Sequence, residues 1–246
     1  MKAVAVIPAR WASTRLPGKV LADIGGKPLI QHVWERVKTA REIAKVVVAC
    51  DEAHVADRIR AFGADARLTR KDHVSGSDRV AEIAERLEAD IVVNIQGDEP
   101  FIDPLLIDEL VRALANDRTS VMATVIKRIT IREDFLDPNI VKAVIDKDSN
   151  ALYFSRAPIP YRRDGERIDF SCCFRHIGIY AYRRAFLLSY CKWPRSYLEQ
   201  EESLEQLRVL ENGGRIKTVE TRTEAIGIDT PEDLVKANDL YRKLHS

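Results

Sequence analysis

Short apolar runs alternate with amphipathic stretches along the first half of the chain. The runs are rich in Val, Ile and Ala and predict strands over residues 3–7, 45–50, a short one ending at 69, and 91–95. Apolar positions at helical spacing predict helices between them, over residues 29–39, 52–62, 77–87 and 104–115. This alternation is typical of a mostly parallel sheet built from βαβ units, so we expect an α/β fold.

The second half has a different pattern, with few helices between its strands. Strands are predicted over residues 121–128, 141–145, 152–155, 177–182 and 215–219. The polar stretch 146–150 predicts a turn, and with it a hairpin. A helix is predicted over 198–211, and a final helix begins at Thr230-Pro231. We therefore expect a single domain over 1–246, with a smaller mixed β annex around 125–180.

Composition excludes several classes of protein. The chain has 246 residues, 46% of them hydrophobic and 31% charged, and a net charge of +1. This balance argues against binding to nucleic acid or to an anionic membrane surface. No apolar run reaches the roughly eighteen residues of a membrane helix, and we expect no signal peptide and no membrane insertion. The four cysteines lack CxxC spacing, which favours idle thiols in a reducing cytoplasm.

The stretch Asn94-Ile-Gln-Gly-Asp-Glu-Pro100 follows a predicted buried strand. Open α/β sheets bind their ligands at the carboxyl ends of parallel strands, where Asp98 would lie. A carboxylate there could present one oxygen to Mg²⁺. The alternative is a turn that happens to be acidic, with Pro100 ending the strand.

A basic loop follows the first strand and reaches the same sheet edge. It contains Arg10, Ser13, Arg15 and Lys19, which suit the binding of a triphosphate. The loop is neither a Walker A motif nor GxGxxG. The alternative is a solvated basic loop without a ligand.

Six blocks of sequence, in order, carry a resemblance to a known family. They are RWASTRLPGK, TRKDHVSGSDR, NIQGDEP, RHIGIYAYRR, LEQLRVLENG and GIDTPEDL. Together they resemble the sugar-activating cytidylyltransferases, above all those that act on 3-deoxy-D-manno-octulosonate (Kdo). The resemblance implies a Rossmann-like nucleotidyltransferase fold, a three-layer sandwich, in a homodimeric, Mg²⁺-dependent enzyme. It also implies the reaction of CTP with Kdo to give CMP-Kdo, used in lipopolysaccharide biosynthesis, and pyrophosphate.

The resemblance also implies roles for individual residues. Asp98 and Asp229 would hold the metal, with Arg15 and Lys19 as catalytic cations. The nucleotide would meet Pro8, Ala9, Arg10, Ser13, Arg15, Lys19, Arg70, Ser75, Gly76, Ser77, Gln96 and Gly97. Kdo would meet Gln96, Arg156, His176, Tyr180, Glu205 and Gln206.

Each assignment has a simpler alternative. Asp229 precedes Thr230 and could merely support a helix N-terminus. His176 could be a satisfied histidine in a strand, and Arg156 a surface residue. Glu205 and Gln206 belong to a Glu-rich stretch that would suit a solvated helix face.

Phosphoryl-type transfer requires positioning and charge neutralisation more than covalent help. We expect in-line attack of the anomeric hydroxyl of Kdo on the α-phosphate, without a nucleotidyl-protein intermediate. Rival functions are activation of sialic acid or an 8-amino Kdo analogue, use of UTP, glycosyl transfer, and non-catalytic nucleotide binding. Glycosyltransferases usually carry Asp-x-Asp, which the QGDEP stretch lacks.

Overall fold

The computed structural model describes residues 1–13, 15–163, 170–223 and 227–245. The chain forms two compact units. The first consists of Met1–Asp108 and Glu224–Ser246, and the second of Glu109–Thr223. The annex expected around 125–180 falls within the second unit.

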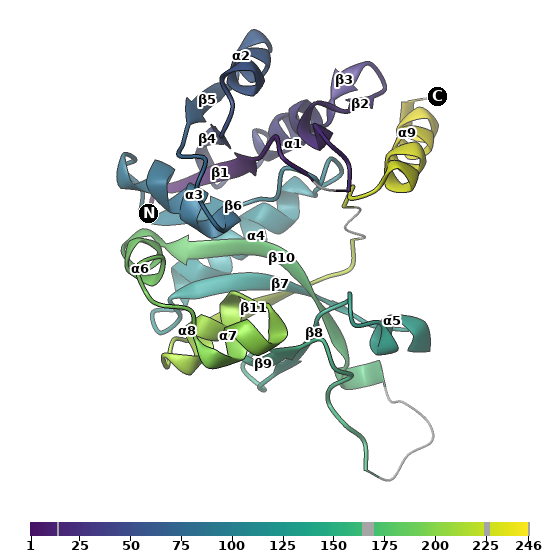
Figure 1. Cartoon of the computed structure of the whole chain (residues 1–246). Coiled ribbons are helices and arrows are strands. Elements are labelled where there is room, and N and C mark those ends of the chain that lie inside the picture. The colour runs from purple at the N-terminus through teal and green to yellow at the C-terminus, as the bar shows by residue number, and fades with distance from the viewer. Residues whose placement is uncertain (14, 164–169, 224–226, 246) are drawn as a thin grey trace. The chain divides into compact units, whose positions relative to one another are not determined.

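The first unit is built on a parallel sheet (Figure 1). Its strands lie in the order β6 (Ile91–Asn94), β1 (Ala3–Ala9), β4 (Ile43–Cys50) and β5 (Asp65–Leu68). β1 is buried along its whole length, as expected for a central strand covered on both faces. The predicted parallel sheet is confirmed.

The sequence predicts that Pro8 ends the first strand, but β1 continues to Ala9. Pairing of β1 with β6 ends at Val6 opposite Asn94, while pairing with β4 continues through Pro8 and Ala9. Pro8 therefore lies beyond one of its two ladders, where a missing N–H removes no bond on that side.

The helices of this unit lie at the positions that the sequence predicts. They are α1 (Leu29–Val37), α2 (Ala53–Ala61), α3 (Gly76–Glu85), α4 (Pro104–Asn116), which crosses into the second unit, and α9 (Pro231–His245). α1 and α3 both contact β1 and β4, and α2 contacts β4 and β5. A capping box between Ser75 and Asp78 starts α3 and satisfies two backbone N–H groups.

The segment before α1, expected to be a loop, contains more structure. It holds a 3₁₀ turn, η1 (Lys19–Leu21), and a small hairpin of β2 (Asp23–Ile24) and β3 (Lys27–Pro28). The hairpin turns at Gly25-Gly26, and the Gly25 N–H donates to Asn238 Oδ1 of α9 at 3.1 Å. Such short strands, fixed by a contact with a distant helix, leave no periodicity for sequence reading to detect.

The second unit is a mixed sheet. Its strands are β7 (Met122–Arg128), β8 (Lys142–Ile145), β9 (Ala151–Ser155), β10 (Phe174–Arg183) and β11 (Ile216–Thr221). β7 runs parallel to β11 and antiparallel to β10, and β8 pairs antiparallel with both β10 and β9. The Asp146 N–H donates to the Asn150 carbonyl at 2.8 Å, which confirms the predicted hairpin turn.

Short helices complete this unit. They are α5 (Arg132–Leu136), η2 (Phe170–Cys172), α6 (Arg184–Tyr190), α7 (Tyr197–Glu202) and α8 (Gln206–Glu211). The single helix predicted over 198–211 is wrong, because Ser203 adopts a left-handed conformation (φ 53°) that ends α7. Buried Glu199 and Arg208 form a bidentate ion pair across this break, with both N–O distances 2.6 Å.

No helix in the described part of the chain is long and apolar enough to cross a membrane. The predicted α/β fold class, with a mostly parallel sheet and a smaller mixed one, is confirmed.

Candidate active site

The carboxyl ends of the parallel strands bring several polar segments to one edge of the first unit. Arg10 follows β1, Asp51 follows β4, Thr69 follows β5, and Asp98 lies a few residues after β6. Because parallel strands end at the same edge, these residues gather where open α/β sheets bind their ligands.

Lys19 lies between the two carboxylates that were predicted to hold a metal. Its Nζ is 2.7 Å from Asp98 Oδ2 and 2.9 Å from Asp229 Oδ1. Arg15 Nη2 contacts the other oxygen of Asp229 at 3.0 Å. All four side chains belong to the first unit, although they come from distant parts of the sequence. The structure thus brings together the four predicted catalytic and metal-binding residues.

The backbone holds the two carboxylates together. The Ile228 N–H donates to the Asp98 carbonyl at 2.9 Å, so the residue before Asp229 is fixed to the Gly97-Asp98 turn. Thr230 Oγ1 accepts from the Asp233 N–H, and Asp233 accepts from the N–H groups of Asp229 and Thr230. Because this capping box starts α9 without the Asp229 side chain, the carboxylate is not the helix cap.

Burial disfavours the charged form of Lys19, but the adjacent Asp98 and Asp229 carboxylates outweigh this effect and raise its pKa above the ordinary value. The ammonium therefore stays protonated and marks a place that favours a cation. Within the described residues, no group of three or more His, Cys, Asp or Glu side chains could hold a metal. Two carboxylates fit Mg²⁺, which commonly takes one or two of them and draws its other ligands from phosphates and water.

The first loop is held by its own contacts rather than being free in solution. Arg10 Nη2 donates to the carbonyls of His73 (3.3 Å) and Val74 (2.8 Å). Gly18 adopts φ 68°, and a Cβ there would lie 2.8 Å from the Trp11 ring, so only glycine fits. Arg15 is exposed and Ser13 is half-buried.

The segment after β5 carries the other predicted nucleotide contacts. Ser75 Oγ accepts the Asp78 N–H and so serves as a helix cap, while Ser77 is buried. Gly76 opens α3 beside the ring of Pro8, with a Cβ position 3.7 Å from Pro8 Cγ. Arg70 is exposed. Their predicted contacts with the nucleotide remain predictions.

The remaining predicted nucleotide residues lie at the ends of the two central strands. Pro8 and Ala9 close β1 and are buried. Gly97 is buried and Gln96 half-buried, just after β6.

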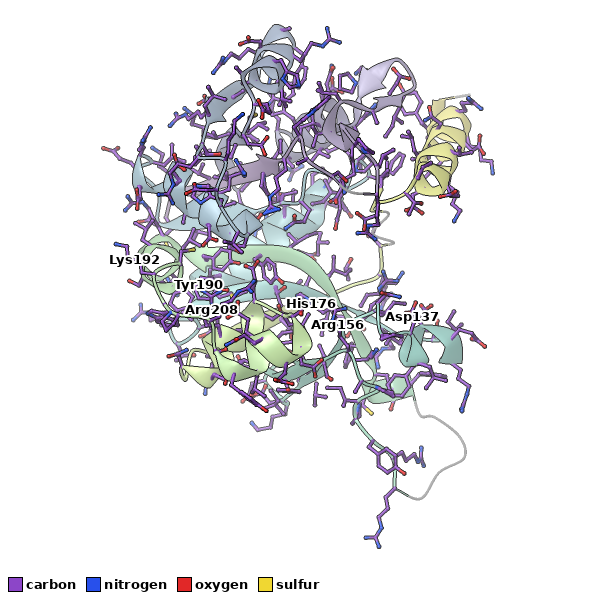
Figure 2. The ribbon with its side chains drawn as sticks, in the orientation of Figure 1. Asp137, Arg156, His176, Tyr190, Lys192 and Arg208 are labelled. Carbon is purple, nitrogen blue, oxygen red and sulfur yellow. The ribbon has the colours of Figure 1, made fainter. Side chains whose placement is uncertain are left out.

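Of the six predicted Kdo residues, Gln96 lies in the first unit and the other five, which include Arg156 and His176 (Figure 2), lie in the second. His176 Nε2 is 2.8 Å from Thr124 Oγ1, whose hydroxyl also lies 2.9 Å from the Ile179 carbonyl. Since the hydroxyl hydrogen can go to only one of them, donation to the carbonyl makes His176 Nε2 the donor. Burial lowers the pKa of His176 to about 3, which keeps the imidazole neutral.

Tyr180 and Gln206 form a second pair in this unit. The Tyr180 hydroxyl donates to Gln206 Oε1 at 3.3 Å. Burial, with a smaller contribution from Glu205, raises the pKa of Tyr180. Gln206 is only 3% exposed, so the solvated-face alternative is wrong for it, and its Nε2 has no partner among the described residues. Glu205 is half-buried at the start of α8.

Arg156 is anchored to the backbone. Its Nε donates to the Glu202 carbonyl at 2.8 Å and its Nη1 to the Pro138 carbonyl at 3.1 Å. The guanidinium is therefore held in one orientation, unlike that of an unattached surface arginine.

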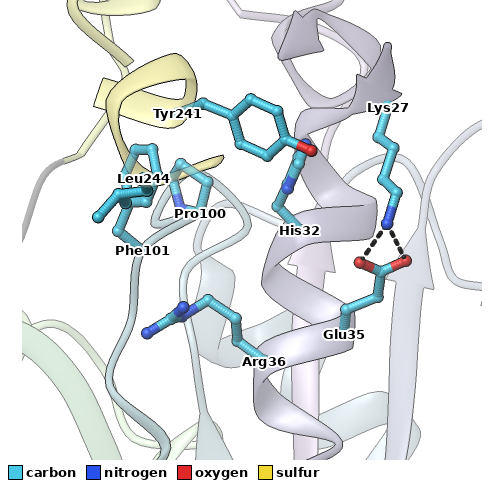
Figure 3. A pocket seen from close by; sticks show the side chains of 8 residues that line it. All are labelled: Lys27, His32, Glu35, Arg36, Pro100, Phe101, Tyr241 and Leu244. Carbon is cyan, nitrogen blue, oxygen red and sulfur yellow. Dashed lines mark hydrogen bonds and ion pairs between the residues drawn. The ribbon is translucent and has the colours of Figure 1, made fainter. Parts of the chain in front are cut away.

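A cavity of about 160 Å³ lies elsewhere in the first unit, between α1, α9 and the segment after Asp98 (Figure 3). Its lining includes His32, Arg36, Phe101 and Tyr241 and none of the predicted site residues.

Sequence analysis missed a polar network at the sheet edge, centred on Asp51 and Arg79. Both signals were present: Asp51 directly follows a strand, and Arg79 stands in the TRKDHVSGSDR block. The resemblance assigns other residues of this block to the nucleotide but no role to Arg79.

Comparison with known proteins tests the resemblance. A family model described as cytidylyltransferase matches residues 4–239. The 3-deoxy-manno-octulosonate cytidylyltransferase of Pelobacter propionicus is 50% identical over 100% of both chains. That of Geobacter sulfurreducens is 51% identical, over 96% of this chain and 98% of the relative.

Solved structures agree with these relatives. A CMP:2-keto-3-deoxy-manno-octonic acid synthetase in complex with CTP has a TM-score of 0.94 and 45% identity, covering 99% of this chain and 100% of its own. A 4-diphosphocytidyl-2C-methyl-D-erythritol synthase from Anaerococcus prevotii, 14% identical with a TM-score of 0.65 over 98% of both chains, shares the fold alone. The resemblance is confirmed: the chain belongs to the cytidylyltransferase family, among the 3-deoxy-manno-octulosonate cytidylyltransferases.

Proposed function

We propose that the chain activates Kdo with CTP, giving CMP-Kdo and pyrophosphate, and that CMP-Kdo serves lipopolysaccharide biosynthesis. One observation carries this reading: Lys19, Asp98, Asp229 and Arg15 converge at the carboxyl edge of a parallel sheet. The chain that carries these four residues is 50–51% identical in sequence to two proteins named for this reaction.

Asp98 and Asp229 are the residues that would hold Mg²⁺. A bound Mg²⁺ would clamp phosphate oxygens and lower the pKa of the attacking hydroxyl, so no side-chain base is required. Arg15 and Lys19, which pair with these carboxylates, are the cations available to neutralise the pyrophosphate as it leaves. The reaction proceeds by in-line displacement without a nucleotidyl-protein intermediate.

Kdo binds through residues of the second unit. The buried Gln206 Nε2 is a donor without a partner among the described residues, and such a group is costly unless a ligand or water meets it. Arg156 suits the Kdo carboxylate because a planar guanidinium pairs with carboxylates bidentately. Neutral His176 would offer a hydrogen bond rather than a charge.

The enzyme works as a homodimer in the cytoplasm. Ile131, Leu136 and Leu152 of the second unit are large apolar side chains exposed to solvent, and β9, which carries Leu152, pairs with β8 alone among the described strands. A second copy of the chain would cover such a surface. The described cysteines form no disulfide bond with one another, which suits a reducing compartment. Light scattering of Leu152→Glu tests the dimer, since a charge there would shift the protein toward monomer.

Pyrophosphate release is the test of the reaction. CTP or UTP with Mg²⁺ is incubated with Kdo, its 8-amino analogue, sialic acid or no sugar. We expect release with CTP and Kdo, abolished by chelation and restored by Mg²⁺. Asp98→Asn and Asp229→Asn should each lower kcat by about a hundredfold or more. Glu232→Gln, which removes an exposed carboxylate near Asp229, is the matched control and should retain activity.

Release with a different sugar or nucleotide would reassign the substrate, and CTP binding without release from any sugar would favour a non-catalytic nucleotide binder. Full activity of Asp98→Asn or Asp229→Asn would refute the metal pair. A nucleotidyl-protein formed on adding CTP alone would refute direct displacement.

A further inference from the structure

The first loop is organised around Trp11. The Trp11 N–H donates to Asp51 Oδ1 at 2.9 Å, and its carbonyl accepts the Gly18 N–H at 3.3 Å. The Trp11 ring packs edge-to-face on His54, with 4.6 Å between ring centroids. Gly18 lies against the same ring. Residues 11 and 18, near the two ends of the basic stretch, therefore contact each other. The bond from Trp11 to Asp51 fixes this contact to the end of β4.

Asp51 is in turn held by a buried cation. Arg79 on α3 is 1% exposed, and its Nη2 lies 3.5 Å from Asp51 Oδ2. Arg79 Nη1 also donates to Thr69 Oγ1 and, at 3.3 Å, to the Arg70 carbonyl. One guanidinium thus joins the segments that follow β4 and β5.

A second set of contacts ties the loop to the same helix. Glu82, three residues after Arg79, accepts from the Arg70 N–H at 3.0 Å and from His73 Nε2 at 2.5 Å. The segment that Glu82 holds supplies the His73 and Val74 carbonyls that receive Arg10. Both anchors of the loop, at Arg10 and at Trp11, therefore lead back to α3.

The charges of Asp51 and Arg79 give this pair a role beyond side-chain packing. Burying an arginine is costly, and burial lowers the pKa of Arg79 while Asp51 opposes that effect. Asp51 is itself an anion directly beside a loop that is to receive a triphosphate. Without Arg79 its charge would repel the ligand and its position would be unconstrained. Paired with Arg79, it can hold the Trp11 N–H at little electrostatic cost to ligand binding.

We propose that Asp51 and Arg79 are positioning residues, which hold the first loop in the conformation that accepts the triphosphate of CTP without touching the nucleotide. This inference rests on the proposed function of the loop. It predicts a specific loss of affinity for CTP, whereas the affinity for the sugar is unaffected.

The test measures CTP binding by calorimetry without sugar, and then KM for CTP and for Kdo. Arg79→Met should weaken CTP binding by about tenfold to a hundredfold. Arg79→Lys, which keeps the charge but not the fork, should lose less. Asp51→Ala should resemble Arg79→Met, and Asp51→Asn should lie between Asp51→Ala and wild type because its amide oxygen still accepts the Trp11 N–H.

Asp65→Asn is the matched control. Asp65 also joins β5 to β4, through Lys45 at 2.8 Å, and pairs with Arg67 of its own strand at 3.1 Å. It stands at the start of β5 rather than at the sheet edge of the site. It should leave the dissociation constant of CTP within about twofold of wild type.

If Asp51 and Arg79 had a purely structural role, their variants would contain less protein able to bind CTP, and the calorimetric stoichiometry would fall. The folded fraction would keep the wild-type dissociation constant for CTP. That result overturns the inference, as does unchanged CTP affinity in Asp51→Ala. If Arg79→Met fails to fold, Arg79→Lys and Asp51→Asn carry the test. Failure of the wild type to release pyrophosphate would refute the proposed reaction, whereas CTP binding would still decide this inference.

Discussion

A Cβ atom built on Gly97 would lie 2.7 Å from the carbonyl oxygen of Pro8. It would also lie 3.2 Å from Cδ1 of Ile30 on α1. The turn after β6 therefore lies too close to the end of β1 to leave room for a side chain at position 97. Asp98 is the next residue, so this contact sets the distance between its carboxylate and the first loop.

Gly97→Ala should therefore lower both stability and activity. The added methyl group must push the turn away from Pro8, at a cost of about 1–3 kcal/mol in the free energy of unfolding. The displaced Asp98 should also lower kcat. Urea unfolding and pyrophosphate release measure the two effects. Gly178→Ala is the control, because nothing lies within 4 Å of its Cβ position. Equal stability of the two variants would contradict the steric argument.

Lys19→Met tests the cation between the two carboxylates. Without the ammonium, the two carboxylates lose the cation that they share and only Arg15 remains, beside Asp229. A fixed counter-charge is worth about 1–3 kcal/mol. We expect a lower melting temperature without Mg²⁺, a larger rise on adding Mg²⁺ than in wild type, and a large loss of kcat.

Lys27→Met is the control for this variant, since Lys27 pairs with the carboxylate of Glu35 at 2.8 Å. It should show no Mg²⁺-dependent rise beyond that of wild type. A Lys19→Met variant that responds to Mg²⁺ no more than Lys27→Met would argue against a cation site between Asp98 and Asp229.

Sequence alone singled out the residues of the candidate site but not the contacts that bring them together. Asp98 was singled out because an acidic pair follows the turn after a predicted buried strand, and this signal is local. That Lys19 lies between Asp98 and Asp229 depends on the Ile228–Asp98 backbone bond, which joins distant segments and leaves no pattern in the sequence. Sequence could not show that the cap of α9 is formed by Thr230 and Asp233 and not by the Asp229 side chain.

The difference between local signals and contacts of distant segments also explains which parts of the fold could be predicted. Buried strands and amphipathic helices were predicted because their periodicity is local. The break at Ser203 was not, because it depends on a left-handed residue and on the Glu199–Arg208 pair across it. Arg79 was missed for a related reason, since an arginine in a helix is normally exposed and only the fold buries it.

Tyr180→Phe and Gln206→Leu should separate the two substrates. Each removes part of the Tyr180–Gln206 pair, so the KM for Kdo should rise by about tenfold while the KM for CTP stays near the wild-type value. Tyr153→Phe, on strand β9, is the matched hydroxyl deletion and should change neither constant. A rise in the KM for CTP alone would remove this pair from the sugar site.

His176 gives a prediction about pH. Its pKa of about 3 lies below the ordinary 6.5, so protonation favours the unfolded chain. The stability that His176 contributes is fully present above pH 6.5 and is lost as the pH falls from 6.5 toward 3, by up to about 1.4 kcal/mol per pH unit. His176→Gln removes this pH dependence. The difference in free energy of unfolding between this variant and wild type should therefore shrink by about 2 kcal/mol between pH 8 and pH 5. Urea unfolding at the two pH values measures the change.

The imidazole signal of His176 should also stay constant in an NMR titration from pH 8 to 5, and a midpoint near 6.5 would show instead that the ring is not desolvated.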